Sequence, residues 1–316
     1  MKSVRLTLIF SLLWALCACS SDDSSIESRN GERVPIRLTA SNVGVKTRAT
    51  GNLQDTQMAE GETVYVWADE NGGSSNYLKA WTLTATTTED PSNAGYYQLT
   101  GSDQYYPSGT NYGLDIYAVH GNFAETLTEG TTERPTTLTH TAMTDQSTAA
   151  NYQKSDLLYA ANANVAYGTT PVPLIFSHQL SRLVIRLVKD PKSKRFDDES
   201  DLAGSTLTIS GTIYHTGTFT LATQAFANTT TTNAITVSKN EDLKFYVGGS
   251  EATTQYSAIL PPQTLTNALI TITTGAGITA SGTFSREMTA GNAYILNVTL
   301  TDPGLIVDKN KYTEQW

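Results

Sequence analysis

Cysteine is nearly absent from this chain. Of 316 residues only two are cysteines, Cys17 and Cys19, and both lie within the first twenty positions. No disulfide can therefore staple the rest of the chain, so its fold must rest on apolar burial and main-chain hydrogen bonds. Histidine is scarce as well, with four residues, and none has a second histidine or a cysteine at the spacing of a zinc site. We therefore expect no metal site.

Charge is sparse and mostly negative. Asp, Glu, Lys and Arg make up 16% of the chain, and the formal net charge is −9. A nucleic-acid partner is not expected, because such proteins need a basic face. The sequence also lacks the nucleophile elbow, the H-E-x-x-H pair and the glycine-rich phosphate loops of common enzymes. We therefore expect neither catalysis nor a cofactor.

Long apolar runs are missing except at the start, "MKSVRLTLIFSLLWALCAC". Two basic residues followed by an apolar run that ends at Ala18 are typical of an export signal rather than a membrane-spanning helix. The letters "LCAC" resemble a bacterial lipobox, which implies that Cys19 is acylated and becomes the mature N-terminus. Several acyl chains on one cysteine would anchor the precursor firmly. The acidic pair Asp22–Asp23 is similar to the surface-export tether of Bacteroidetes lipoproteins, which implies the outer membrane.

Short apolar runs separated by Gly, Asn, Asp and Pro fill the remaining chain, which is rich in threonine. This pattern predicts an all-β fold with about half a dozen strands in each half, or two stacked β-sandwiches. The break between the halves is expected near residue 171, with the charged loop 189–201 as an alternative. The threonine-rich stretch 125–153 has no clear periodicity and is expected to be a surface excursion.

The first strand candidate is "VPIRLTA". Val34, Ile36, Leu38 and Ala40 share one face, which predicts a half-buried strand, and the proline after Val34 suggests a sheet edge. A polar stretch with Arg48 follows. Arg48 is either an ordinary loop residue or the place where the chain is cut, between Arg48 and Ala49; such a cut would remove the anchor and the strand together.

Several later segments resemble the Bacteroidetes fimbrillin-like family: "DLLYAANA", "PLIFSHQLSRLVIRLV", "YSAILPPQ" and "TAGNAYILNVTL", in this order. The resemblance implies two tandem transthyretin-like β-sandwich domains and export as a lipoprotein to the cell surface. It also implies assembly with other fimbrial subunits after an arginine-specific surface protease has freed the first strand, as stalk, tip or anchor subunit. The chain would then divide into a signal peptide (1–18), a tether with the removable strand (19–48), an N-terminal sandwich (49–170), a C-terminal sandwich (171–301) and a tail (302–316).

Strand addition is the assembly step that this resemblance implies: a strand from a neighbouring subunit would fill the groove that the first strand leaves. The tail is the candidate donor. Its alternation is poor, because Lys309 and Lys311 continue the face that Leu305 and Val307 begin. A subunit that accepts a strand without donating one, as at a fimbrial tip, fits this departure.

A tyrosine-rich segment offers a different function. Tyr105, Tyr106 and Tyr112 in "YYPSGTNYGLDIY" could stack on sugars, which would suit a lipid-anchored glycan-binding protein of the cell surface. Tyrosine is also common on β-sandwich surfaces, so this segment alone does not choose between the two functions. His178, beside the apolar Phe176, is expected to be a structural residue.

Overall fold

Strands dominate the part of the chain that the computed structural model describes. It describes residues 33–42, 57–71, 75–108, 113–193, 205–240, 245–247, 250–252, 254–302, 304–308 and 312–316. From Val34 onward these residues belong to one unit. The all-β prediction is confirmed, with one short helix added.

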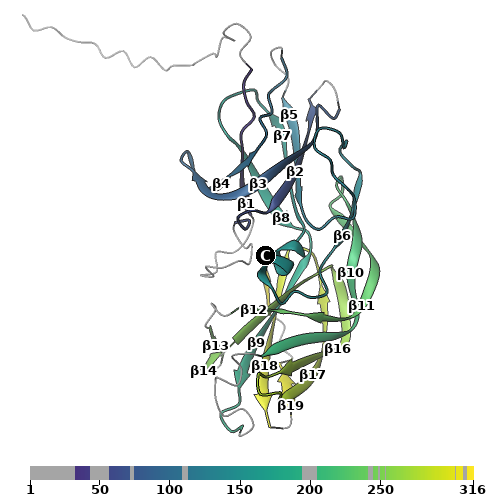
Figure 1. Cartoon of the computed structure of the whole chain (residues 1–316). Helices are drawn as coiled ribbons and strands as arrows, with labels where there is room; N and C mark the ends of the chain where they lie inside the picture. The colour runs from purple at the N-terminus through teal and green to yellow at the C-terminus, as the bar shows by residue number, and fades with distance from the viewer. Residues whose placement is uncertain are drawn as a thin grey trace, which may run out of the picture. The chain divides into compact units, whose positions relative to one another are not determined.

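The first half forms a closed barrel whose strands follow the order β1-β4-β3-β2-β5-β7-β8 (Figure 1). Its neighbours pair antiparallel except for β1 and β8, which run parallel and close the barrel. The strands are β1 (Leu38–Asn42), β2 (Thr63–Glu70), β3 (Leu78–Asp90), β4 (Asn93–Gly101), β5 (Leu114–His120), β7 (Leu158–Val165) and β8 (Val172–His178).

The second half contains two larger sheets. One consists of β11 (Ala225–Thr236), β10 (Thr206–Thr220), β16 (Gln263–Thr273) and β17 (Thr279–Met288), with β6 (Thr137–Thr141) paired to β10. The other consists of β12 (Ser238–Asn240), β15 (Thr254–Leu260), β9 (Ser181–Lys189), β18 (Asn292–Thr301) and β19 (Gly304–Val307), with β20 (Tyr312–Gln315) paired to β18. A separate ribbon joins β13 (Phe245–Val247) to β14 (Ser250–Ala252).

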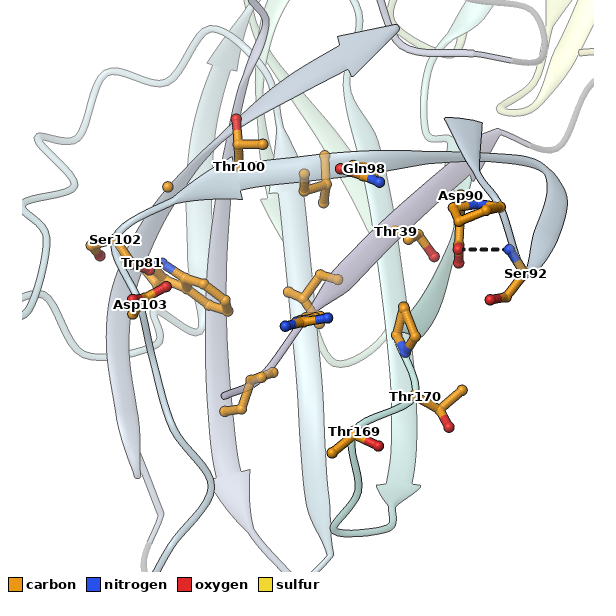
Figure 2. Close-up of a pocket in the computed structure, with 17 residues that line it drawn as sticks. Thr39, Trp81, Asp90, Ser92, Gln98, Thr100, Ser102, Asp103, Thr169 and Thr170 are labelled. Carbon is orange, nitrogen blue, oxygen red and sulfur yellow. Dashed lines mark hydrogen bonds between the residues drawn. The ribbon is translucent and has the colours of Figure 1, made fainter. Parts of the chain in front are cut away.

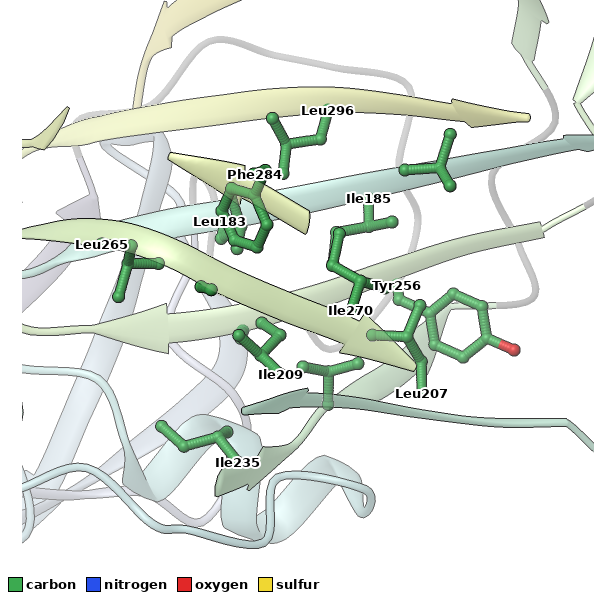
Figure 3. Close-up of a cluster of buried hydrophobic side chains, with 14 of the residues drawn as sticks. Leu183, Ile185, Leu207, Ile209, Ile235, Tyr256, Leu265, Ile270, Phe284 and Leu296 are labelled. Carbon is green, nitrogen blue, oxygen red and sulfur yellow. The ribbon is translucent and has the colours of Figure 1, made fainter. Parts of the chain in front are cut away.

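Apolar side chains at alternate positions of the strands form the core between these two sheets. Leu183 and Ile185 on β9 and Leu296 on β18 belong to the same buried cluster as residues of β10, β11, β16 and β17 (Figure 3). Because successive side chains of a strand point to opposite faces, every second residue of β9 enters this core. The two sheets therefore form a β-sandwich around one apolar layer.

The pairing of β8 corrects the expected break at residue 171. β8 pairs with β1 and β7 inside the barrel, whereas β9, which starts at Ser181, pairs with β15 and β18. A division at 171 would separate β8 from both partners. The alternative at 189–201 also fails, because β9 before it and β10 after it both belong to the second half.

The stretch 125–153 is not the surface excursion that its polar composition suggested. It contains β6, which pairs with β10, and most of α1 (Ala149–Lys154), whose N-cap Thr148 accepts a hydrogen bond from the N–H of Asn151. Leu138 and Tyr152 are buried. Within the described ranges, no helix has the length and apolar character needed to cross a bilayer.

His140 on β6 is fully buried, and its two hydrogen bonds fit a neutral ring. Nδ1 accepts from the N–H of Asn122 at 3.1 Å, and Nε2 donates to the carbonyl oxygen of Ser155 at 3.0 Å. Burial lowers the pKa of His140 from 6.5 to about 4, although the Ser155 carbonyl and Asp156 oppose the shift. Between about pH 6.5 and about pH 4, His140 is therefore protonated in the unfolded chain and neutral in the folded chain.

This difference predicts a loss of stability in mild acid. Stabilisation by neutral His140 is complete above the unfolded pKa of about 6.5 and is lost as the pH falls towards about 4, by roughly 3 kcal/mol at most. We expect His140→Gln to have a smaller difference in unfolding free energy between about pH 7 and about pH 4.5 than the natural chain, measured by urea denaturation. His215→Gln, at a half-buried histidine, is the control. Equal pH differences in the natural chain and the His140 variant would contradict the assignment.

Candidate functional site

β1 closes the barrel by pairing on both sides. Its residues Leu38–Asn42 run parallel to Val172–Phe176 of β8, and on the other side Thr39 pairs with Gln98 and Ala40 with Tyr97 of β4. The strand begins and ends later than the expected Val34–Ala40. It is also not an edge strand, because both its neighbours are paired to it. Without β1, strands β4 and β8 would become open edges.

The apolar face of the first strand lies in the barrel core, as the alternation predicts. Ile36, Leu38 and Ala40 are 5%, 3% and 4% exposed, and Val34 packs against the same cluster. Burying one isoleucine or leucine contributes about 1.5–3 kcal/mol. The first strand is thus part of the core, although it lies at the N-terminal end of the described chain.

The segment that follows Gln98 separates from the first strand for a few residues and then pairs with it again. Before β1, Ile36 N–H donates to the carbonyl of Gln104 at 2.8 Å, and Tyr106 N–H donates to that of Val34 at 3.0 Å. Because Thr39 pairs with Gln98, residues 36–38 lie opposite the longer segment 99–104. The longer segment must therefore bow away from the first strand. A cavity of about 600 Å³ occupies the space beside β1 (Figure 2).

The expected lipidation and cleavage residues, Cys19, Arg48 and Ala49, lie outside the described residues, as does Tyr112. The described residues contain no group of three His, Cys, Asp or Glu side chains placed to hold a metal ion.

Of the three tyrosines expected to stack on sugars, the structure describes Tyr105 and Tyr106, and neither presents an exposed ring. Tyr106 is 4% exposed, packs in the barrel core with its ring 5.4 Å from that of Tyr167, and has its pKa raised by burial. Tyr105 is half-buried, and its carbonyl accepts a hydrogen bond from the hydroxyl of Tyr77 at 2.8 Å. Burial in the barrel core removes Tyr106 as a stacking platform.

The C-terminal tail is an edge of its own sheet. β19 and β20 both pair antiparallel with β18, and the guanidinium of Arg286 donates to the carbonyl oxygen of Tyr312 at 2.7 Å. The last residue, Trp316, is buried, and its backbone N–H donates to the carbonyl oxygen of Gly291 at 2.9 Å. The expected donor segment is therefore already occupied within its own subunit.

A buried contact between a histidine and an aspartate lies beneath the last residue of the tail. The ring of Trp316 stacks on His178 with centroids 3.8 Å apart and planes 13° apart, while Nδ1 of His178 lies 2.9 Å from a carboxylate oxygen of Asp156. His178 thus has the structural role expected for it. Its two partners could not be inferred from the sequence, because no local motif links positions 156, 178 and 316.

Comparison with known proteins finds one matching family model and several similar solved structures. A family model described as fimbrillin-like matches residues 47–316. A candidate cell adhesion protein from Bacteroides ovatus has a similar solved structure, with a TM-score of 0.63, 16% identity and coverage of 90% of this chain and 98% of that chain. One from Bacteroides uniformis has a TM-score of 0.59, 21% identity and coverage of 89% and 98%. No curated protein matches the chain significantly.

The burial of β1 predicts unequal effects of substitutions at two adjacent positions. Leu38→Ala should lower the free energy of unfolding by about 2–5 kcal/mol, because it leaves a hole in the barrel core. The control Arg37→Ala, at an exposed position of the same segment, should change it by about 0.5 kcal/mol or less. Chemical denaturation measures both, and similar values would show that the first strand adds little to the core.

Proposed function

The chain belongs to the fimbrillin-like family, and from this we propose that it is a subunit of a bacterial surface fimbria assembled by strand exchange. In this proposal Cys19 is acylated, the precursor reaches the outer membrane, and an arginine-specific surface protease cuts between Arg48 and Ala49. The released strand leaves the barrel, and a strand of a neighbouring subunit takes its place. The subunit's role is structural, in adhesion, rather than catalytic.

The observation that carries this proposal is the position of β1. It contributes buried side chains to the barrel core, yet it lies outside the segment matched by the family model, which starts at residue 47. A strand joined to the barrel by a cleavable segment can be removed without breaking any other strand. Its removal would leave an apolar groove between β4 and β8, which main-chain bonds and alternate side chains of a new strand could fill.

The covering strand also suits export. An open sheet edge with an apolar groove favours aggregation, so a precursor benefits from keeping it closed until the surface is reached. We propose that the barrel and the second β-sandwich correspond to the two tandem transthyretin-like domains of the family.

The tail supports an accepting role better than a donating one. β19 and β20 would have to leave β18, and Trp316 its stack on His178, before the tail could reach a neighbour. We therefore favour a tip or accessory subunit over a repeating stalk subunit.

Cleavage is tested by the N-terminal residue of the protein recovered from cell surfaces. We expect the natural chain to begin at Ala49 and Arg48→Ala to retain acylated Cys19, because the protease requires arginine. Lys46→Ala changes a basic residue of the same segment and should still give Ala49. Recovery of acylated Cys19 from the natural chain would refute cleavage at this site.

Strand exchange can be separated from cleavage by a disulfide lock. Ser41 on β1 pairs with Ile175 on β8, so Ser41→Cys with Ile175→Cys should form a bridge that holds the cut strand in its groove. We expect this variant to be cut normally but to enter fimbriae only after reduction, as judged by immunoblot of sheared fibres. Thr208→Cys with Thr271→Cys joins β10 to β16 as the control and should assemble without reductant. Assembly of the oxidised β1 lock would contradict exchange at this groove.

A further inference from the structure

Two buried polar groups, one on β1 and one near it, lack a hydrogen-bond partner within the part of the chain that the structure describes. Thr39 is 2% exposed and Asp90 is 4% exposed, yet Oγ1 of Thr39 and Oδ2 of Asp90 make no hydrogen bond with another group of the described residues. The other carboxylate oxygen of Asp90 accepts from the N–H of Ser92 at 3.0 Å in the turn between β3 and β4. A buried polar atom without a partner is destabilising, which makes a pair of them a feature to explain.

Both residues line the cavity of about 600 Å³ beside β1. In Figure 2, Thr39, Gln98 and Asp90 lie toward one end of the cavity, and Trp81 and Asp103 lie toward the other. The cavity is therefore a polar space with a hydrogen-bonding end.

We propose that this cavity binds a neutral saccharide of one or two sugar units. Sugar hydroxyl groups both donate and accept, so one ligand could donate to Asp90 Oδ2 and bond to the hydroxyl of Thr39 and the amide of Gln98. The apolar face of a sugar ring would lie against the wall that includes Pro91 and Pro171, because Trp81 is only 4% exposed. Pockets that bind small molecules combine such a wall with a few well-placed polar groups.

The charges of the lining favour a neutral ligand. Arg37 supplies one positive charge, and Asp90 and Asp103 supply two negative charges. Phosphorylated or acidic sugars would meet a carboxylate at each end of the cavity. Six hydroxyl side chains in the lining extend the capacity for hydrogen bonding without adding charge: Thr39, Ser92, Thr100, Ser102, Thr169 and Thr170.

β1 itself forms part of this site through Thr39, and Arg37 lies directly before β1. The next step rests on the proposed function, in which β1 leaves after cleavage. The saccharide then binds the uncut precursor, and release of the strand destroys the site. A ligand that binds only the closed form stabilises it in proportion to RT ln(1 + [L]/Kd). The saccharide should therefore slow the release of β1.

The site can be tested on the purified, uncut full-length chain, whether or not the chain assembles into fimbriae. The probes are neutral mono- and disaccharides of glucose, galactose, mannose and N-acetylglucosamine on an array, followed by titration calorimetry of those that bind. We expect at least one to bind, and Asp90→Asn and Thr39→Val each to weaken binding roughly tenfold or more. Asp90→Asn keeps the oxygen that accepts from Ser92 and changes only the unpartnered position.

Asp145→Asn is the matched control. Asp145 is exposed and accepts from the N–H of Ser147 at 3.0 Å in a turn like that of Asp90, but it lies outside the cavity. The Asp145→Asn variant should bind the saccharide as the natural chain does. Thr39→Val should fold with equal or greater thermal stability, because it removes an unpartnered buried hydroxyl, so its loss of binding would not reflect unfolding.

Two results would overturn the proposal: no neutral saccharide binds, or binding is unchanged in either cavity variant. Neither of them bears on cleavage at Arg48, so the proposed function would stand or fall separately.

Discussion

The parallel pairing of β1 with β8 is the constraint on which the first half of the molecule depends. All other neighbours in the barrel pair antiparallel, and this contact alone turns an open sheet into a closed barrel. A closed barrel has no free edge and encloses its apolar face completely. The strand that achieves this lies at one end of the described chain, before the segment that carries Arg48, so closure depends on the element that is topologically easiest to remove.

Loss of β1 would affect one core and leave the others whole. Ile36, Leu38 and Ala40 belong to the barrel cluster, whereas the sandwich cluster and the third cluster, which includes Trp67, Tyr159, Phe219 and Trp316, contain no residue of the first strand. Loss of β1 would therefore remove no side chain from the sandwich cluster or from the third cluster. A subunit built in this way can open one groove while its remaining structure keeps its shape, which strand exchange requires.

Alternation along the sequence identified faces but not partners. It predicted that Ile36, Leu38 and Ala40 point inward, because that depends only on the two-residue period of a strand. It did not reveal that β8 belongs to the barrel or that β6 pairs with β10, because those pairings join residues far apart in sequence. Thr39 and Asp90 carry no motif at all; only the fold brings them to one cavity. The stack of His178 on Trp316 is non-local in the same sense.

β1 and β20 differ in what their departure would expose. This difference favours a mechanism in which an incoming strand displaces β1, over one in which β1 leaves first and the groove stays empty. Every residue of β20 is exposed, so its loss would uncover a sheet edge and the site of Trp316, whereas loss of β1 would uncover core side chains. Two buried aliphatic side chains contribute about 3–6 kcal/mol, a large share of the roughly 5–15 kcal/mol that stabilises a domain. Under the proposed strand exchange, the groove would need an incoming strand with apolar residues at alternate positions. The tail of this chain lacks that pattern, so in this proposal a subunit of another kind would supply the strand.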